Sequence, residues 1–226
     1  MKSLRWLGHS MFLLTSAQGL RIVTDPFGKD VPYPQPDVTA DVVTVSHQHS
    51  DHNASEVVKG NPVLLEGVSR KVNDFAKVDR TIKDTRFRTV KTFHDSERGS
   101  RRGLNAVFVI ADAGPIICHL GDLGHVPDDE AVREIGPVDV LLIPVGGYYT
   151  IGAVEAWEVV ARIKPRVVVP MHYKTAAVGT WPIAPVEEFL KGKDNVRMVG
   201  SSEISFDKES LPASTEVFVL EPPSGR

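Results

Sequence analysis

The sequence predicts a mixed α/β (α+β) protein, an αββα-type layered sandwich. Short runs rich in Val and Ile recur along the chain, and helical patterns between them are fewer. The early runs come largely in pairs, whereas strand-helix-strand units appear later. This order fits a layered sandwich better than a doubly wound sheet, which would need regular βαβ alternation.

The predicted strands are apolar runs bounded by Gly, Pro, Asp and Asn, which favour turns. Their β-branched residues suit a pleated, half-buried surface. They cover residues 11–14, 20–24, 42–45, 88–93, 106–110, 116–119, 140–143, 166–169 and 216–220.

The clearest helix is predicted between Gly152 and Pro165, because a proline disfavours helical backbone at the residue before it. Asn53, with Glu56 three residues on, resembles a capped start for a helix over residues 53–59. Weaker helical patterns cover residues 71–77, 128–135 and 185–191. The apolar face of the clearest helix is formed by Ala153, Trp157, Val160 and Ile163.

Length and composition favour a single domain over residues 1–226, since no repetitive or Gly/Ser-rich segment marks a linker. The chain carries 26 basic and 29 acidic side chains and a net charge of -3, so a nucleic acid or a membrane is not the expected partner. A small molecule is expected instead, and a homo-oligomer is compatible with the sequence. Cys118 is the only cysteine, which excludes an internal disulfide and favours the reducing cytoplasm.

Histidines and aspartates follow several predicted strands at the point where each strand ends. The stretch SHQHSDH, residues 46–52, comes directly after the run 42–45. If the strand ends share one edge of the sandwich, their side chains converge on one cleft. The other residues in such positions are His94, Asp122 and His172.

Imidazole and carboxylate are ligands that suit zinc, manganese or iron. Alternate residues of an extended loop point to the same side, so His47 and His49 can bind one ion, with Asp51 and His52 turned toward a second. Two ions about 3.5–4 Å apart can share a bridging hydroxide, and the carboxylate of Asp122 is suited to bridge them. The alternative for the motif is a solvated polar loop, and for His94 or His172 alone a hydrogen-bonded structural role.

The stretch HQHSDH resembles the HxHxDH signature of the metallo-β-lactamase-fold hydrolases, and further motifs extend the resemblance to nearly the whole chain. They are similar to the branch related to ascorbate-6-phosphate lactonase. These motifs are Trp6-Leu7-Gly8-His9-Ser10, Thr24-Asp25-Pro26, His119-Leu120-Gly121-Asp122-Leu123-Gly124-His125, Pro144-Val145-Gly146-Gly147 and Pro170-Met171-His172-Tyr173.

The resemblance implies a four-layer αββα sandwich of two mixed β-sheets and a site for two divalent ions, with zinc favoured and manganese or iron as alternatives. It implies that Asp25 orients a metal-bound histidine. It leaves the roles of His9, His119 and His125 open: each could pack near the site or support its ligands, and His119 and His125, which flank Asp122, could also be ligands themselves. Around His94, the third histidine ligand of the first ion, the sequence reads Phe93-His94-Asp95-Ser96, where the superfamily commonly has Gly-His-Thr. The implied ligands are His47, His49 and His94 for one ion, Asp51, His52 and His172 for the other, and Asp122 between them.

The reaction expected from such a site is hydrolysis of a small ester, lactone or phosphoester by the bridging hydroxide, with Asp51 handling the proton. One alternative is a metal-binding sensor or binding protein without turnover. Another is a phosphodiesterase acting on nucleotides, phospholipids or RNA. Cys118 beside His119 is not a predicted nucleophile, because neighbours on a strand point to opposite faces.

Two segments are candidates for substrate binding. Arg98, Arg101 and Arg102 follow His94 and could place a guanidinium near an anionic substrate, although an exposed turn is the alternative. The second segment precedes the helix predicted after Gly152, so its backbone N–H groups could bind an anion, or its glycines could serve a tight turn. It comprises Gly146, Gly147, Tyr148 and Tyr149.

Overall fold

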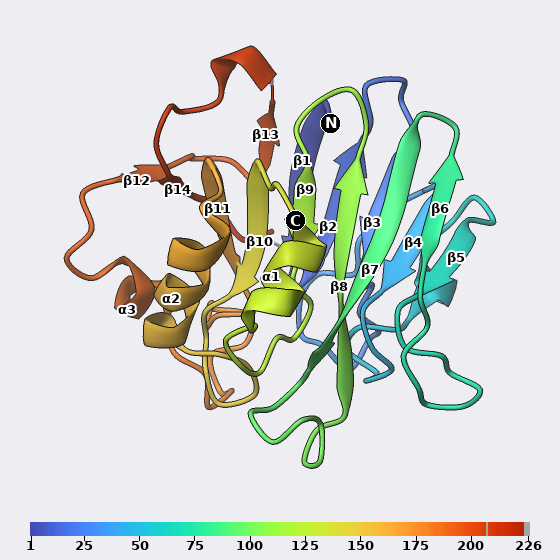
Figure 1. Ribbon diagram of the computed structural model, residues 1–226, viewed down its shortest axis with the longest axis horizontal. Coiled ribbons are helices and arrows are strands. Elements are labelled where there is room, and N and C mark those ends of the chain that lie inside the picture. Colours follow the sequence, from blue (N-terminus) through green and yellow to red (C-terminus); the bar gives the residue numbers. More distant parts are fainter. Residues whose placement is uncertain (207, 224–226) are drawn as a thin grey trace.

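The computed structural model of the protein describes residues 1–206 and 208–223; residues 207 and 224–226 of the predicted single domain lie outside the described residues. The strands form two mixed β-sheets, one of six strands and one of eight, and a large apolar core includes residues of both (Figure 1). Helices α1 (Asp129–Ile135) and α2 (Ala153–Ile163) lie over the eight-stranded sheet, on the face turned away from the other sheet. The two mixed sheets of the predicted α+β sandwich are thus confirmed.

The six-stranded sheet contains the first strands of the chain and has the order β13-β1-β2-β3-β4-β5. Strands β3 and β4 are parallel, whereas β2 is antiparallel to both of its neighbours. The bounds are β1 Ser3–Gly8, β2 Met11–Thr15, β3 Arg21–Thr24, β4 Val42–Val45, β5 Val63–Glu66 and β13 Glu203–Ser205.

The eight-stranded sheet has the order β12-β14-β11-β10-β9-β8-β7-β6. Strands β9, β10, β11, β14 and β12 are parallel, and the remaining strands alternate in direction. The bounds are β6 Asp79–Ile82, β7 Thr85–Phe93, β8 Leu104–Ala111, β9 Ile117–His119, β10 Val140–Pro144, β11 Val167–Met171, β12 Val196–Met198 and β14 Glu216–Val219.

Each predicted strand is present, but β1, β5, β6, β12 and β13 were not predicted. Four of these five are the outermost strands of the two sheets, in the orders given above. An edge strand is covered less than a central one and needs no continuous apolar run. In β6, for example, Asp79, Arg80 and Thr81 are exposed and Ile82 is half-buried.

The predicted helices divide into three that form and two that do not. The confirmed helices are α1, α2 and α3 (Val186–Leu190). Residues 53–59 contain only a 3-10 turn, η1 (Ser55–Val57), and residues 71–77 form turns in which Asn73 has φ +49° and Val72 is exposed. Another 3-10 turn, η2, covers Lys208–Ser210, and no helix in the described part of the chain is long and apolar enough to cross a membrane.

The apolar face of α2 includes the four predicted residues, which belong to the main core or pack against it, and extends to Ala156 and Val159. Ala156, Val159 and Val160 are its buried residues, whereas Ala153 and Trp157 are half-buried at the edge of this face. Lys164 ends the helix in a left-handed conformation with φ +56°, directly before Pro165.

Strand β4 is buried on both faces, which explains its unbroken apolar run. Val42 belongs to the main core cluster, whereas Val43 and Val45 belong to a second cluster with Phe27 and Tyr33. Successive residues of a strand point to opposite faces, so the second cluster lies on the other side of the six-stranded sheet. Loop residues and η1 supply much of that outer layer, which is less helical than the predicted sandwich.

The strand directions place the predicted site residues along one edge of each sheet. Strands β1, β3 and β4 run in the same direction, as do β7, β9 and β11. In the first sheet these strands lead into His9, Asp25 and the loop 46–52. In the second they lead into His94, the segment before Asp122, and His172.

Candidate metal centre

Ligand-type side chains from the two sheet edges gather at one place. In the first group, one nitrogen from each of His47, His49 and His94 lies within 4.8 Å of the others. A second group fits the same limit and consists of His9, Asp51, His52 and His172. The structure therefore brings together residues that lie up to 163 positions apart, between His9 and His172.

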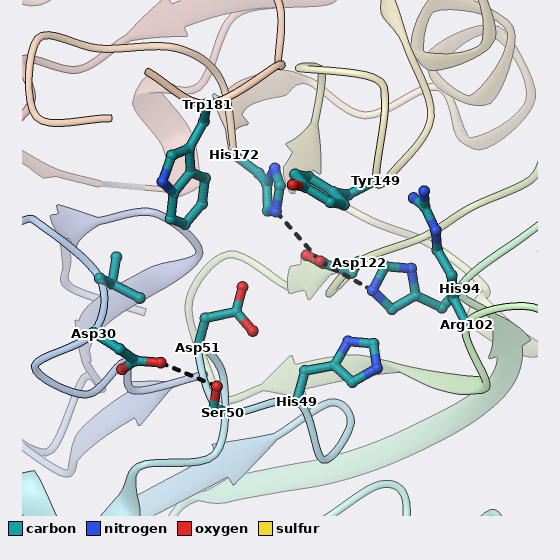
Figure 2. Close-up of a pocket in the computed structure, with 11 residues that line it drawn as sticks. Asp30, His49, Ser50, Asp51, His94, Arg102, Asp122, Tyr149, His172 and Trp181 are labelled. Atoms are coloured by element: carbon teal, nitrogen blue, oxygen red, sulfur yellow. Dashed lines mark hydrogen bonds and ion pairs between the residues drawn. The ribbon is translucent and has the colours of Figure 1, made fainter. Parts of the chain in front are cut away.

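Asp122 lies between these two groups. Its Oδ1 is 3.3 Å from Nε2 of His52. Its Oδ2 is 3.2 Å from Nε2 of His94 and 3.3 Å from Nε2 of His172, the two contacts marked by dashed lines in Figure 2. One carboxylate thus contacts histidines of both groups, as a bridging ligand would have to.

Asn105 was not predicted, yet it holds the backbone that carries Asp122. Its Oδ1 accepts the Asp122 N–H at 3.0 Å, and its Nδ2 donates to the Leu120 carbonyl at 2.9 Å. Gly121 between them must be a glycine, because a Cβ would lie 2.4 Å from that same Oδ1. A lone asparagine inside strand β8 carries no sequence signal for such a role.

Asp25 fixes the orientation of two histidine rings. Its Oδ2 accepts hydrogen bonds from Nδ1 of His52 at 2.9 Å and from the Ser46 hydroxyl at 2.5 Å, and its Oδ1 accepts the Ser46 N–H at 2.8 Å. Because the Ser46 hydrogen points to Asp25, the Ser46 oxygen accepts from Nδ1 of His47 at 2.8 Å. Nδ1 of each ring is therefore committed to a hydrogen bond, which leaves Nε2 as the nitrogen that can bind a metal.

The Asp25→Asn protein is expected to bind metal about 10- to 100-fold more weakly than the wild type. An amide Nδ2 cannot accept hydrogen bonds from His52 and Ser46, so the rings lose the proton arrangement that frees Nε2. Competition with a coloured chelator measures the affinity. The matched control is Asp84→Asn, a carboxylate that accepts from Ser16 and Gln18 away from the centre; equal affinities in the two variants would contradict the role of Asp25.

The charges at the centre favour a cation. Burial alone lowers the pKa of His52, but the carboxylates of Asp122 and Asp51 outweigh it and hold that pKa well above its usual range. Burial, with nearby His52, lowers the pKa of His47 well below its usual range, so this ring is neutral. A neutral imidazole beside ionised carboxylates is the donor set that a divalent metal requires.

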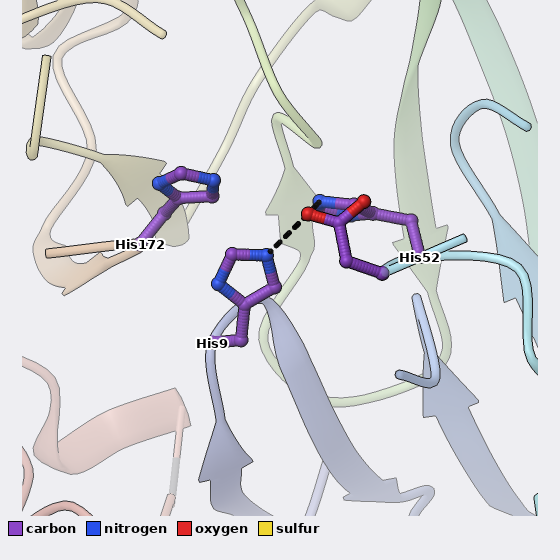
Figure 3. Close-up of side chains that lie close together, drawn as sticks. His9, His52 and His172 are labelled. Atoms are coloured by element: carbon purple, nitrogen blue, oxygen red, sulfur yellow. Dashed lines mark hydrogen bonds and ion pairs between the residues drawn. The ribbon is translucent and has the colours of Figure 1, made fainter. Parts of the chain in front are cut away.

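His9 contacts the same cluster and holds Asp51 (Figure 3). Its Nε2 is 3.2 Å from Oδ2 of Asp51, and its ring centroid is 4.3 Å from that of His172. Burial, followed by the charge of His172, lowers the pKa of His9 to about 4. The neutral ring donates its Nε2–H to Asp51, whose pKa His52 and His9 keep low against the effect of burial.

Several buried polar atoms at the centre have no hydrogen-bond partner among the described residues. An unsatisfied buried group of this kind costs about 1–3 kcal/mol. The atoms are Nε2 of His47, Nε2 of His52, Nδ1 of His94, Nδ1 of His172 and Oδ1 of Asp122. Divalent cations at the centre would satisfy the Nε2 atoms of His47 and His52 and Oδ1 of Asp122, so the donor set fits zinc, manganese or iron.

His119 and His125 use both of their ring nitrogens on the backbone. Nε2 of His119 donates to the Ser10 carbonyl at 2.9 Å, and its Nδ1 accepts the Gly121 N–H at 3.2 Å. Nε2 of His125 accepts the Phe93 N–H at 3.2 Å, and its Nδ1 donates to a carbonyl. These two rings support loops near Asp122 and leave no nitrogen free for a metal.

The arginine segment after His94 divides into one residue at the cavity and two outside it. Arg102 lines the cavity shown in Figure 2. Arg98 is exposed and lines none of the described cavities, and Arg101 is exposed and pairs with Glu97 at 3.5 Å.

The structure shows how the glycines of the segment predicted to bind an anion are used within the chain. The Gly147 N–H donates to the Ile151 carbonyl at 3.1 Å, so it is not available to a ligand. A Cβ on Gly146 would lie 2.2 Å from the His172 carbonyl oxygen. The glycines instead serve a tight turn and a close backbone approach, which brings Tyr149 to the cavity while Tyr148 is 64% exposed.

A cavity of about 420 Å³ opens over the metal-type ligands. His94, Asp122 and His172 form part of its wall, and Tyr149 and Trp181 flank it (Figure 2). The other lining residues are Asp30, Val31, His49, Ser50, Asp51 and Arg102. A volume of this size suits a small molecule.

Comparisons with known proteins agree with this arrangement. The sequence pattern of the family described as "Beta-lactamase superfamily domain" matches residues 3–172. A UPF0173 metal-dependent hydrolase of Natranaerobius thermophilus is 30% identical over 97% of this chain and 96% of its own, and one of Pyrococcus abyssi is 32% identical over 84% and 92%. A crystal structure from Thermotoga maritima, described as a candidate zinc-dependent hydrolase of the metallo-β-lactamase superfamily, is 41% identical over 99% of this chain and 100% of its own, with a TM-score of 0.78.

Proposed function

The chain belongs to the metallo-β-lactamase superfamily and its UPF0173 family of metal-dependent hydrolases, and from this membership we propose that it hydrolyses a small ester, lactone or phosphoester with two divalent ions. The observation that carries the proposal is the position of Asp122, whose carboxylate contacts histidines of two separate ligand groups. One group for each ion and one shared carboxylate is the donor set of a dinuclear site.

The proposed ligands of one ion are His47, His49 and His94. Those of the other are Asp51, His52 and His172, with Asp122 shared. Bound divalent ions supply two effects, a lower pKa of bound water and polarisation of a substrate oxygen. Zinc is favoured because imidazole dominates the donor set, and manganese or iron are the alternatives.

Asp51 is the group proposed to accept the proton of the attacking water. Its side chain is 29% exposed at the cavity wall, whereas that of Asp122 is 3% exposed, so water reaches Asp51 more readily. The hydrogen bond from His9 to Oδ2 holds the carboxylate in place. A positioned carboxylate of this kind contributes about 10²- to 10⁴-fold to the rate.

The cavity and the charge of the chain support a small substrate. The cavity volume of about 420 Å³ accommodates a metabolite-sized ester. The net charge of -3 gives no electrostatic attraction for RNA. Among small esters, lactones are part of the proposal because motifs of the chain resemble the branch related to ascorbate-6-phosphate lactonase.

Removal of metal from the protein is expected to lower hydrolysis at least about 100-fold, and reconstitution with zinc, manganese or iron should restore it at two ions per chain. Elemental analysis gives the stoichiometry, and a panel of lactones, phosphodiesters and thioesters identifies the substrate class. Failure to bind any of these metals tightly would exclude the proposal. Tight binding without turnover of any substrate in the panel would instead indicate a metal-binding sensor.

A further inference from the structure

A second hollow of about 360 Å³ adjoins the cavity over the metal centre. The two share His94, Arg102 and Tyr149 in their walls, so the Arg102 side chain lies where they meet. The second hollow is also lined by Ser96, Arg101 and Thr150, side chains that interact with anions, and by the carboxylate of Asp95.

Arg102 is held in a defined position between the two hollows. Its Nη1 donates to the Tyr148 carbonyl at 2.5 Å, and its guanidinium carbon lies 5.2 Å from the Tyr149 ring centroid and 5.8 Å from that of Tyr148. These contacts engage one nitrogen and the flat face of the guanidinium. The fork of N–H groups that binds an oxyanion is planar and pre-organised in such an arginine.

Asp95 fixes the loop that carries Arg102. Its Oδ1 accepts the N–H groups of Glu97 and Gly99 at 2.8 and 2.9 Å, and its Oδ2 accepts those of Arg101 and Arg102 at 3.0 and 2.7 Å. Asp95 stands where the Gly-His-Thr form has threonine, and it therefore fixes the backbone of the arginine segment. It also has its negative charge compensated by these donors.

The hollow therefore presents positive charge next to the metal centre. Among the described residues, Arg102 has no carboxylate within ion-pair distance, whereas Arg101 pairs with exposed Glu97. Arg102 is the single lysine or arginine that lines the cavity within the described part of the chain. An unpaired guanidinium at this place is suited to a ligand that carries an oxyanion.

We propose that this hollow binds an anionic group of the substrate, a carboxylate or a phosphate, and that Arg102 selects for it while the scissile bond lies at the metal centre. This assignment deepens the proposed hydrolase function and rests on it. Arg102 is then a specificity-determining residue, and substrates without the anionic group should bind more weakly. A charged hydrogen bond of this kind corresponds to about 10- to 100-fold in affinity.

Binding of simple carboxylates to the zinc-loaded protein tests the proposal without requiring turnover. Calorimetry compares butyrate with dicarboxylates from succinate to adipate, so that one carboxylate can bind the metals and the other can reach Arg102. The wild type should bind the best-fitting dicarboxylate about 10- to 100-fold more tightly than butyrate. A phosphonate analogue of that dicarboxylate shows which oxyanion the hollow prefers.

Arg102→Gln should abolish this preference while leaving the affinity for butyrate and the zinc content within about twofold of the wild type. Arg102→Lys should retain part of it, and Arg98→Gln, in the same loop but outside the cavities, should retain all of it. A preference that persists in Arg102→Gln, or no preference in the wild type for any length, would overturn the proposal. Absence of hydrolysis would contradict the proposed function alone, because binding is measured separately.

Discussion

The Asp122→Asn protein is expected to lose about 10³-fold or more in the rate of hydrolysis and to retain less than two metal ions per chain. Asp122 is the carboxylate that contacts His52, His94 and His172, so its replacement removes negative charge shared by both ligand groups. Stabilisation of the transition state by metal ions is worth several kcal/mol, and each 1.36 kcal/mol corresponds to about tenfold in rate. Elemental analysis and the rate on the best substrate of the panel measure both effects.

Asp41→Asn is the control for this variant. Its carboxylate accepts the Arg21 N–H and contacts Lys83 at the surface, so its loss should leave the rate within about twofold. If Asp122→Asn keeps two ions and the wild-type rate, the carboxylate does not bridge the ligand groups and the dinuclear proposal is wrong.

Asp51→Asn is expected to lower the turnover number about 10²- to 10⁴-fold while most of the metal stays bound. The amide keeps the size of the side chain but cannot accept a proton from water. Asp122, His52 and His172 remain to hold the second ion. The assay contains saturating zinc, so that a lower rate reports the chemical step and not metal loss.

Asp37→Asn, an exposed carboxylate paired with Lys59, should leave the turnover number of the protein unchanged. Circular dichroism on both variants establishes that they are folded. A wild-type turnover number in Asp51→Asn would assign proton transfer to another group and contradict the role given to Asp51.

The strands of the central sheets could be predicted because burial on both faces demands continuous apolar runs, as in β4 and β10. The helix predicted over residues 71–77 was wrong because local turn contacts dominate there. Asn73 adopts φ +49°, the Asp74 side chain accepts the Phe75 N–H, and Val68 forms a bridge with Phe75. The spacing of apolar residues, from which the helix was predicted, carries no information about these hydrogen bonds and bridges.

The candidate site could be predicted in part because its residue types are unusual and its positions follow strand ends. His47, His49 and Asp51 form a local motif, because all three lie within a loop of seven residues. Asn105 and Asp95 could not be predicted, since an asparagine within a strand and an aspartate in a loop are common in any protein. Their roles depend on backbone groups that only folding places nearby.

The histidines and carboxylates of the candidate site, their order and their place at the ends of apolar strands could be predicted from the residues alone. Folding brings the Nε2 atoms of His94 and His172 to 3.2 and 3.3 Å from Oδ2 of Asp122, and it places Arg102, but not Arg98, at the cavity. Residue type and strand pattern are local properties of the chain. The meeting of two sheet edges depends on strand order and direction, which long-range packing sets.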